Sequence, residues 1–366
     1  MAQYGTADGT LRAEQISRLP LGTGTPPAGL DRWRAALPEP SAPFDDAIGG
    51  DCTMCIKQHR DHGSHGYALW LEVEERCNLD CLFCYNPWRP AASTAEELQP
   101  ISAAEWEDLV DLLMSDIELE SVTLSGGEPL MYPGLVDVVA LLRRRSLPVA
   151  ITTNGRSGTR ARIAALAGAG VQQISVPVHS HRPEVHDSLA GGASWHAAIR
   201  TIALAREAGV DVVLTAVLTG RNSAEAELDG LAGVVAALGV RKVVVNCFHA
   251  TGQGLLHESE LHISNDEFAE ALAWLRHKLP DTAVTMGSPP PSAPDADGGA
   301  GTVRRIAVSP RGELKFCNHS STGLLNLRRA PRDETAHILQ RISAGEHADL
   351  LGSINNCACL GQTSSL

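Results

Sequence analysis

The stretch Cys77-Asn-Leu-Asp-Cys81-Leu-Phe-Cys84 carries three cysteines and directly follows the apolar run ALWLEVE at 68–74. That run predicts a β-strand, so the cysteines fall on the loop at its carboxyl end. Three thiolates on such a loop can bind three irons of a 4Fe–4S cluster and leave the fourth iron open. A zinc loop or a chance spacing is the alternative explanation of three cysteines taken alone.

A second motif, Ser125-Gly126-Gly127-Glu128-Pro129, follows the next predicted strand, SVTLS at 121–125. Paired glycines allow backbone groups to approach a ligand closely, because they carry no Cβ atom. Glu128 adds a negative charge beside them. The motif alone also describes an ordinary turn, but its place one strand after the cysteine loop favours a ligand site.

The two motifs, in this order, resemble those of the radical S-adenosylmethionine (SAM) superfamily over roughly residues 67–250. The resemblance implies that Cys77, Cys81 and Cys84 hold a 4Fe–4S cluster whose open iron binds SAM through its amino and carboxylate groups. In this family an electron from a flavodoxin- or ferredoxin-type donor cleaves SAM, and the resulting 5′-deoxyadenosyl radical abstracts hydrogen from a substrate. The cofactor carries the difficult chemistry, and the protein positions the substrate and excludes water.

The resemblance also implies which residues contact SAM. In this family the aromatic residue before the third cysteine packs by the adenine, and the glycine motif receives the methionine ammonium. The ends of the third and fourth strands resemble further positions that touch SAM, although an Asn-Gly pair at a strand end is commonly just a turn. The expected SAM contacts are Phe83, Gly126, Gly127, Glu128, Asn154 and Ser175.

Strand-like and helix-like runs alternate from Tyr67 onward. The strand-like runs are ALWLEVE (68–74), SVTLS (121–125), PVAIT (148–152), QISVPV (173–178), VDVVLTAVL (210–218) and RKVVVNCF (241–248). The helix-like runs between them are 103–115, 134–145, 160–167, 195–208 and 224–238. This alternation predicts an α/β fold with a parallel sheet, closed into a partial (β/α)6 TIM-like barrel.

Changes in composition divide the chain into segments. They are a Pro/Gly-rich N-terminal segment (1–50), a Cys/His-rich lead-in (51–66), the partial barrel (67–255), a bridging helix and linker (256–302), and a small C-terminal appendage (303–366). In the appendage, TVRRIAVSPRGELKFC (302–317) predicts a β-hairpin that turns at 310–312. A helix is expected at 332–344.

The hairpin element from Gly312 to Cys317 resembles the SPASM/Twitch appendages of radical SAM enzymes, which carry auxiliary 4Fe–4S clusters. The resemblance implies one auxiliary cluster with Cys317, Cys357 and Cys359 among its ligands. The sequence departs from the family pattern in two ways: the cysteine that the family carries about ten residues before the hairpin glycine is absent from 296–303, and the terminal pair is Cys-x-Cys rather than Cys-x-x-Cys. Structural zinc or free thiols are the alternatives.

The sequence leaves the fourth ligand of this auxiliary cluster open. Candidates are Cys52 or Cys55, Cys247, His319, or the substrate itself at an open iron. The segment Cys52-x2-Cys55-x3-His59-x2-His62 also has the spacing of zinc ligands, and binding no metal is a further alternative.

Other residues with possible chemistry follow the later strands. Cys247 ends the sixth strand, where a thiol facing the barrel mouth would return hydrogen to a substrate radical; a buried core residue is the alternative. An acid/base site is one interpretation of His179, His181 and His186, and helix capping with surface solvation is the alternative. The run Arg143–Arg145 ends a predicted helix, where positive charges suit the helix dipole; docking of an acidic electron donor is the alternative role.

Composition limits the class of protein. Hydrophobic residues make up 43% and charged residues 20% of 366, as in ordinary globular domains. A net charge of −13 argues against a nucleic-acid partner. No apolar run is long enough to span a membrane, and a signal-peptide pattern is lacking, so we expect a cytoplasmic protein. In that compartment, nine cysteines favour metal or redox chemistry over disulfides.

Two substrate classes and one role without catalysis stay open. The stretch from Tyr67 through the glycine motif resembles peptide-modifying members, such as the enzyme that cross-links the pyrroloquinoline quinone precursor. It favours cross-linking or epimerisation of a ribosomal peptide. The acidic charge and short N-terminal segment favour a small cationic substrate and an aminoglycoside or sugar dehydrogenase or epimerase. A non-catalytic iron–sulfur electron carrier is the third possibility, and the glycine motif speaks against it.

Overall fold

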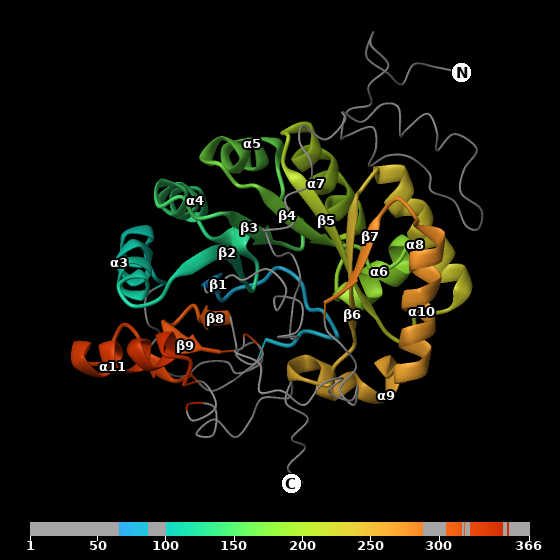
Figure 1. The fold of residues 1–366 in the computed structure, drawn as a ribbon. Coiled ribbons are helices and arrows are strands. Elements are labelled where there is room, and N and C mark those ends of the chain that lie inside the picture. The colour runs from blue at the N-terminus through green and yellow to red at the C-terminus, as the bar shows by residue number, and fades with distance from the viewer. Residues whose placement is uncertain are drawn as a thin grey trace.

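The computed structural model describes residues 66–86, 100–287, 305–316, 318, 323–346 and 350, which are coloured in Figure 1. The expected N-terminal segment 1–50, nearly all of the lead-in 51–66 and the linker 288–301 lie outside these residues. So do the candidate ligands Cys52, Cys55, Cys317, His319, Cys357 and Cys359.

A ten-stranded sheet forms the centre of the described chain, in the order β10-β9-β8-β1-β2-β3-β4-β5-β6-β7. Its central strands are β1 (Tyr67–Glu74), β2 (Leu119–Gly126), β3 (Val149–Thr152), β4 (Gln173–Pro177), β5 (Asp211–Leu218) and β6 (Lys242–Cys247). Each of these pairs in parallel with the next. The α/β class and the parallel strands of the partial barrel are therefore confirmed.

The edges of the sheet go beyond the six predicted strands. The strand β7 (Ala283–Met286) pairs in parallel with β6, inside the segment expected to be helix and linker. On the other side, β8 (Arg305–Val308) pairs in parallel with β1 and forms a hairpin with β9 (Glu313–Lys315), which β10 (Leu325–Asn326) extends. The predicted hairpin thus continues the barrel sheet.

Helices connect the strands and cover the outer side of the sheet. They are α3 (Ala103–Met114), α4 (Leu135–Arg144), α5 (Arg160–Ala169), α6 (Pro183–Ala190), α7 (Trp195–Glu207), α8 (Glu225–Leu238), α9 (Glu258–Leu261), α10 (Asn265–Lys278) and α11 (Arg332–Ser343). Short 3-10 segments, η1 (Pro129–Met131) and η2 (Gly252–His257), follow β2 and β6. Figure 1 shows α3, α4, α5, α7, α8 and α10 in an arc outside the strands.

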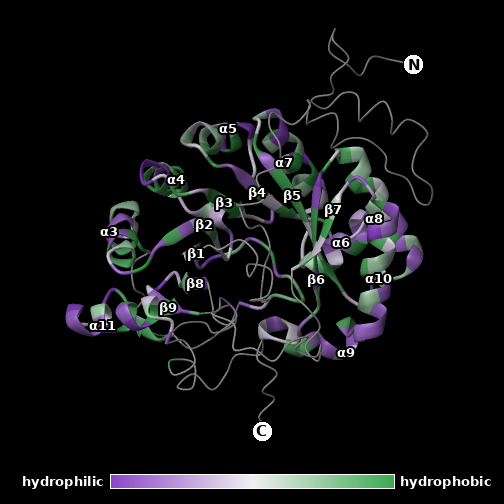
Figure 2. Ribbon diagram, in the orientation of Figure 1, coloured by the Kyte–Doolittle hydropathy of each residue, from purple (hydrophilic) through white to green (hydrophobic). Residues whose placement is uncertain are grey.

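Alternation along the strands gives the sheet two different faces. On β1, Leu69, Leu71 and Val73 belong to the apolar core under the helices, whereas Trp70 and Glu72 point to the concave side. The same alternation predicts a largely polar concave face, which includes Glu72, Thr123, Ser125, Thr152, Gln173, Ser175, Thr215, Asn246 and Lys315. Figure 2 shows hydrophobic and hydrophilic residues alternating around the outer helices, as amphipathic helices on a sheet require.

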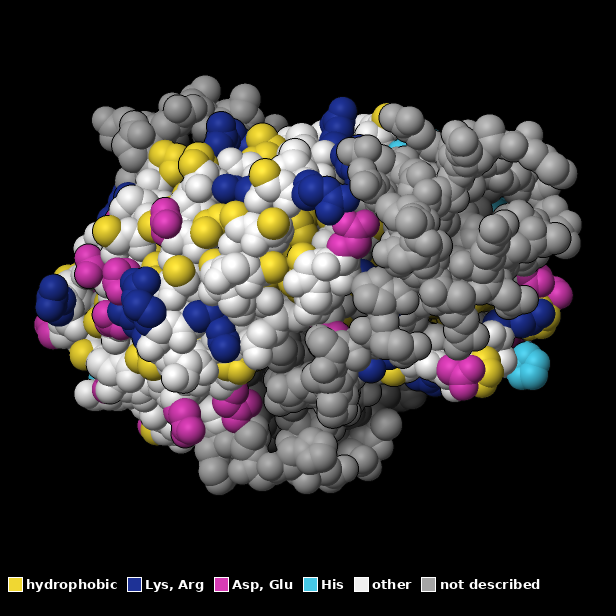
Figure 3. All heavy atoms as spheres, turned by 90° about the horizontal axis from the view of Figure 1, so that it is seen from above, with side chains coloured by type: hydrophobic (Ala, Val, Ile, Leu, Met, Phe, Trp, Pro, Cys, Tyr) yellow, Lys and Arg dark blue, Asp and Glu magenta, His cyan; other side chains and the backbone are white. Residues whose placement is uncertain are grey.

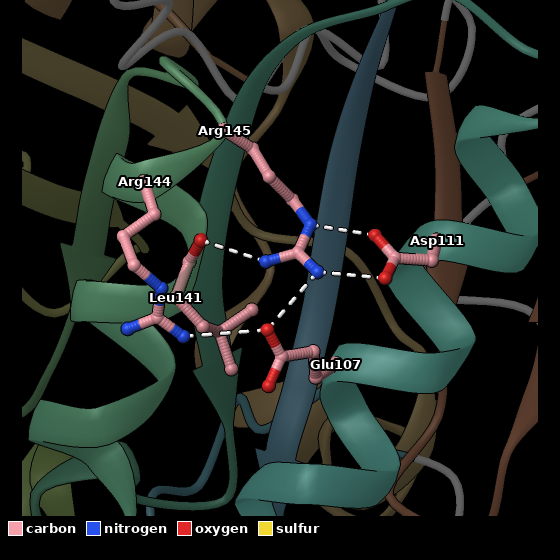
Figure 4. Close-up of polar contacts among 5 residues, drawn as sticks. All are labelled: Glu107, Asp111, Leu141, Arg144 and Arg145. Atoms are coloured by element: carbon pink, nitrogen blue, oxygen red, sulfur yellow. Dashed lines mark hydrogen bonds and ion pairs between the residues drawn. The ribbon is translucent and has the colours of Figure 1, made fainter.

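Ion pairs join the end of α4 to α3 (Figure 4). Arg145 donates to both carboxylate oxygens of Asp111, over 2.6 and 2.7 Å, and to Glu107 over 3.1 Å. Arg144 reaches the same Glu107 oxygen over 3.3 Å. The Arg145 guanidinium holds the pKa of Asp111 below its ordinary value. These arginines therefore serve the packing of two helices, in addition to suiting the helix dipole.

The surface carries charges of both signs. Figure 3 shows, on the face seen from above, acidic and basic side chains interspersed with hydrophobic ones. Among the helices that the structure describes, none has the length and apolar character needed to cross a membrane.

Candidate functional site

The loop after β1 carries Cys77, Cys81 and Cys84 at the edge of the sheet where the parallel strands end. All three cysteines are partly exposed, and none of them forms a disulfide. Within the described ranges, no three His, Cys, Asp or Glu side chains are arranged as a ready metal site. Because these three cysteines form no disulfide, their sulfur atoms remain available as ligands.

The cysteine loop rests on the turn that ends α6. The amide of Leu82 donates to the carbonyl oxygen of Leu189 over 3.0 Å. Gly191 adopts a left-handed conformation with φ +65°, and a Cβ atom there would clash with the carbonyl of Asp80. Glycine at this turn therefore allows the backbone of the loop to pack directly on α6.

The last cysteine is held by the segment after β6. The carbonyl oxygen of Cys84 accepts a hydrogen bond from Gln253 N–H over 2.8 Å, and its own amide donates to Cys81 over 3.1 Å. Gly252 has φ +54°, and a Cβ atom there would meet the backbone of Cys84 and Tyr85. The segment after β6 thus contains a glycine turn that packs against the cysteine loop.

The two glycines of the second motif are required by a neighbouring loop. Gly126 has φ +134°, and a Cβ atom on it would clash with the carbonyl of Glu74. A Cβ atom on Gly127 would clash with the carbonyl of Arg76. Gly127 N–H donates to Glu74 over 2.6 Å, and Glu128 N–H donates to Arg76 over 2.8 Å. In addition to the expected role of admitting a ligand, these glycines allow the two loops to pack together.

Glu128 is fully buried and joins the glycine motif to the end of β3. Its Oε1 accepts from the Thr153 hydroxyl over 2.5 Å and from Leu130 N–H over 2.9 Å, and its Oε2 accepts from Asn154 N–H over 2.8 Å. Burial raises the pKa of Glu128 to about 7, although these hydrogen bonds act in the opposite direction. Its carboxyl group therefore holds the two loops together.

Asn154 connects the glycine motif to the cysteines. Its side-chain amide donates to Asn78 Oδ1 over 2.8 Å and contacts Cys77 Sγ at 3.6 Å. Its side-chain oxygen accepts from Arg156 N–H over 2.8 Å. Since its backbone amide binds Glu128, Asn154 is the point where the two sequence motifs meet.

The remaining expected SAM contacts lie on the same side of the sheet. Phe83 is partly buried, and its ring meets the His179 ring edge-on at a centroid distance of 4.7 Å. Ser175 is 4% exposed on β4, where it pairs with Thr152 of β3 and Val213 of β5. The carbonyl of Ser175 accepts from Thr153 N–H over 3.0 Å, so this strand end is tied to the same network.

Residues 71–231 match the family model of the Radical SAM superfamily. The matched residues include the cysteine loop, the glycine motif and Asn154. The chain contains a radical SAM domain.

Similarity to curated relatives extends beyond the radical SAM domain. The chain is 28% identical over 262 residues to PqqA peptide cyclase from Xanthomonas campestris pv. campestris (strain B100), covering 70% of this chain and 68% of the relative. It is 32% identical over 176 residues to GTP 3′,8-cyclase from Streptomyces coelicolor (strain ATCC BAA-471 / A3(2) / M145), covering 45% and 49%. It spans about half the length of that second relative. Relatives named as cyclases are enzymes, and this chain, which contains a radical SAM domain, is an enzyme.

A solved structure shares the fold of this chain. Streptococcus suis SuiB, bound to its precursor peptide SuiA, has a TM-score of 0.57 at 15% identity. The likeness covers 72% of this chain and 63% of SuiB, which is less than two thirds of that protein. At this identity the comparison supports the partial-barrel fold.

The radical SAM family implies a 4Fe–4S cluster and SAM, and the described residues fit both. Three cysteines on one loop, none of them in a disulfide, are the donor set that such a cluster takes. Beside them, the buried Ser125 hydroxyl and Asn86 Oδ1 have no hydrogen-bond partner among the described residues. Buried polar atoms are normally paired, so these two groups suit a polar ligand at this edge of the sheet.

The histidines after β4 lie inside the radical SAM domain. Val217 N–H donates to His179 Nδ1 over 3.2 Å, His179 N–H donates to His186 Nδ1 over 3.1 Å, and His186 Nε2 lies 3.0 Å from the Ser194 hydroxyl. Burial lowers the pKa of His179 well below its ordinary value and that of His186 to about 4. The two rings are neutral, and their hydrogen bonds hold the segment after β4 against β5 and α6. This structural role differs from the expected acid/base site and from the alternative of capping and solvation.

Cys247 does not face the barrel mouth as expected. It is 2% exposed within the apolar core, opposite Leu218 of β5, and its neighbour Asn246 takes the concave side by alternation. Burial raises the pKa of its thiol to about 11. This orientation favours the alternative of a core residue over that of a hydrogen donor.

Two further features were missed from the sequence. Thr153 binds Glu128, and a buried ion pair joins Glu72 of β1 to Lys315 of β9 over 3.1 Å. The signal for Glu72 was available, because it is a charged residue at an inward position inside a strand whose other charged residue, Glu74, lies at the strand end. Its partner could not be predicted, because Lys315 is 243 residues away in the sequence.

Proposed function

We propose that this radical SAM enzyme modifies a peptide and that Cys77, Cys81 and Cys84 are the thiolate ligands of its 4Fe–4S cluster. The observation that carries the site is the junction at Asn154, whose side chain contacts Cys77 Sγ while its backbone amide binds Glu128. This junction unites the cysteine loop with the glycine motif at the carboxyl edge of the sheet, where active sites of barrels lie.

The residues of the chain bind and orient SAM in this proposal. When bound, the cluster and SAM supply reductive cleavage and hydrogen-atom abstraction. Phe83, braced by His179, offers an aromatic surface for the adenine. Asn154 and Ser175 offer polar groups to SAM. Glu128 keeps the glycine motif against the cysteine loop, so that the backbone of the motif presents a fixed surface to the methionine group.

A peptide is the substrate class that the comparisons favour. PqqA peptide cyclase is similar over most of this chain, and SuiB, which shares the fold, was solved with a precursor peptide. The buried position of Cys247 removes the thiol expected to donate hydrogen during epimerisation. Among peptide modifications, cross-linking is therefore the reaction that we propose.

We also propose a second, auxiliary 4Fe–4S cluster in the C-terminal region. Its ligands would be Cys317, Cys357 and Cys359, with Cys52 and Cys55 as candidates for the fourth. These residues lie outside the described ranges, and the observation that supports the cluster is the β8–β9 hairpin, which leads directly to Cys317. A low-potential donor of the flavodoxin or ferredoxin type would reduce the enzyme.

A small-molecule substrate is the second candidate. GTP 3′,8-cyclase acts, by its name, on a nucleotide, and it is 32% identical to this chain over 176 residues. That similarity covers 45% of this chain against 70% for PqqA peptide cyclase, so the peptide is the stronger proposal. A sugar dehydrogenase or epimerase belongs to this second class.

Turnover with defined substrates tests the proposal. The reconstituted enzyme is incubated without oxygen with SAM, dithionite and a short precursor peptide encoded beside its gene, and a small aminosugar is the parallel arm. We expect 5′-deoxyadenosine and a peptide that has lost two hydrogen atoms, identified by mass spectrometry. An altered aminosugar beside an unaltered peptide would support the second candidate instead.

A further inference from the structure

A buried ion pair crosses the edge of the concave face. Lys315 Nζ on β9 lies 3.1 Å from Glu72 Oε2 on β1, and their side chains are 1% and 0% exposed. The strand β8 lies between them, and Ala307 of β8 is the residue that pairs with Lys315. The small Ala307 side chain gives the lysine stem a path across the intervening strand.

The ion pair extends to the cysteine loop. Lys315 Nζ reaches the carbonyl oxygen of Asn318 over 3.5 Å, and the Asn318 side-chain amide donates to the Tyr85 hydroxyl over 2.9 Å. Asn318 is itself 1% exposed. Because Tyr85 follows Cys84 directly, these contacts connect the C-terminal hairpin to the third cysteine.

Contacts outside this buried network also attach the hairpin. Arg311 in the turn of the same hairpin lies 2.6 Å from Glu75, in an ion pair whose side chains are 38% and 37% exposed. Burial of two charges is costly, and apolar residues in their place often leave a protein equally stable. The buried pair adds something that the Arg311 ion pair does not, which is a fixed position for Asn318 beside Tyr85.

We propose that Glu72, Lys315 and Asn318 are positioning residues for Cys84 and act through the Tyr85 hydroxyl. The inference rests on the proposed function, in which Cys84 is a cluster ligand. The amide of Cys84 binds Cys81 and its carbonyl binds Gln253, so the hydroxyl contact restrains the residue that follows. Groups that orient a metal ligand tune the metal site, and here they set the access of SAM to the cluster.

Tyr85→Phe tests the last link of the network, because it removes one hydroxyl and keeps the ring. In the reconstituted enzyme we expect the Kd for SAM to rise about fivefold, as the loss of one hydrogen bond predicts. The change that SAM causes in the electron paramagnetic resonance spectrum of the reduced cluster should also differ from wild type. The unfolding temperature of the apoprotein should stay within about 3 °C.

Arg311→Met is the matched control, because it removes the half-exposed ion pair of the same hairpin and does not touch Tyr85. It should leave the SAM affinity and the spectrum unchanged. The double variant Glu72→Gln/Lys315→Met tests the other end of the network without leaving a buried charge unpaired. It should reproduce the spectral change of Tyr85→Phe.

Wild-type affinity and spectra in both Tyr85→Phe and the double variant would overturn the inference. The same spectral change in Arg311→Met would also overturn it, since any loosening of the hairpin would then suffice. A wild-type protein that assembles no iron–sulfur cluster would contradict the proposed function itself, and this inference would then fail because it depends on that function. The two failures are therefore distinguishable in the same set of samples.

Discussion

Leu124 and Ser125 are neighbours on β2, yet they belong to opposite faces of the sheet. Leu124 is 0% exposed in the apolar core under the helices. Ser125 is 3% exposed on the concave face, and its hydroxyl has no hydrogen-bond partner among the described residues. The apolar face holds the fold together, and the concave face with its carboxyl edge holds the polar groups. Substitutions on the two faces should therefore fail in different ways.

The largest expected effect is on the carboxyl edge. Cys84→Ala should reduce 5′-deoxyadenosine formation by more than about 100-fold, since even the loss of groups that only orient a ligand costs about 10- to 100-fold. Stability of the apoprotein should change by less than about 1 kcal/mol, because this thiol is partly exposed. Iron content, product chromatography and denaturant unfolding measure the three quantities. Wild-type iron content and activity in Cys84→Ala would contradict the ligand assignment.

The two neighbours on β2 give the sharpest contrast in stability. Leu124→Ala should lower the free energy of unfolding by about 2–5 kcal/mol, because it leaves a cavity in the core. Ser125→Ala removes a buried hydroxyl without a partner and should change that free energy by less than about 1 kcal/mol. Urea unfolding of both apoproteins compares them. Equal losses in the two variants would contradict the assignment of the two faces.

The buried carboxyl group of Glu128 should make stability depend on pH. Its pKa is raised by burial from 4.5 to about 7, so between these values the folded state keeps a proton that the unfolded state loses. The contribution of Glu128 to the free energy of unfolding should therefore fall as pH rises through this window, by on the order of 3 kcal/mol in total. The fall should be absent in Glu128→Gln, as measured by urea unfolding at several pH values.

His186 provides the control with the opposite sign. Its pKa is lowered by burial from 6.5 to about 4, so the unfolded state binds the extra proton within that window and stability rises with pH. His186→Gln should reduce this rise, to which the buried His179 contributes in the same direction, and should keep the fall due to Glu128. A Glu128→Gln variant with the same pH dependence as wild type would show that this carboxyl group is not desolvated.

The smallest effect should come from the ion pairs between α3 and α4. Arg145→Met should lower the free energy of unfolding by less than about 1 kcal/mol, because exposed ion pairs contribute little. SAM cleavage should keep its wild-type rate with either dithionite or a flavodoxin as reductant. A rate that is slower with flavodoxin but unchanged with dithionite would support docking of an electron donor at Arg143–Arg145.

Local patterns explain how much of the fold was predictable. The six central strands and the helices between them, apart from the unpredicted α6, follow from apolar runs of the right length. The site follows from two short motifs whose strands are adjacent in the sheet. By contrast, β7 is a four-residue strand in a segment expected to be helix and linker. Its signal is too short to distinguish from a linker, and only pairing with β6 defines it.

Side-chain direction and distant partners were not predictable. The orientation of Cys247 depends on the face that each residue of β6 takes once β5 is its neighbour. The network from Glu72 to Tyr85 depends on β8 pairing with β1, a contact between distant parts of the chain. Residue types indicated the chemistry of the site, but the connections within it required the sheet.

The most direct test of the central claim is reductive cleavage of SAM by the reconstituted wild-type protein. With dithionite and without oxygen, 5′-deoxyadenosine should form, and a variant with Cys77, Cys81 and Cys84 all replaced by alanine should form none above background. Absence of 5′-deoxyadenosine from wild-type protein that holds its iron, or equal amounts from the triple variant, would contradict the account.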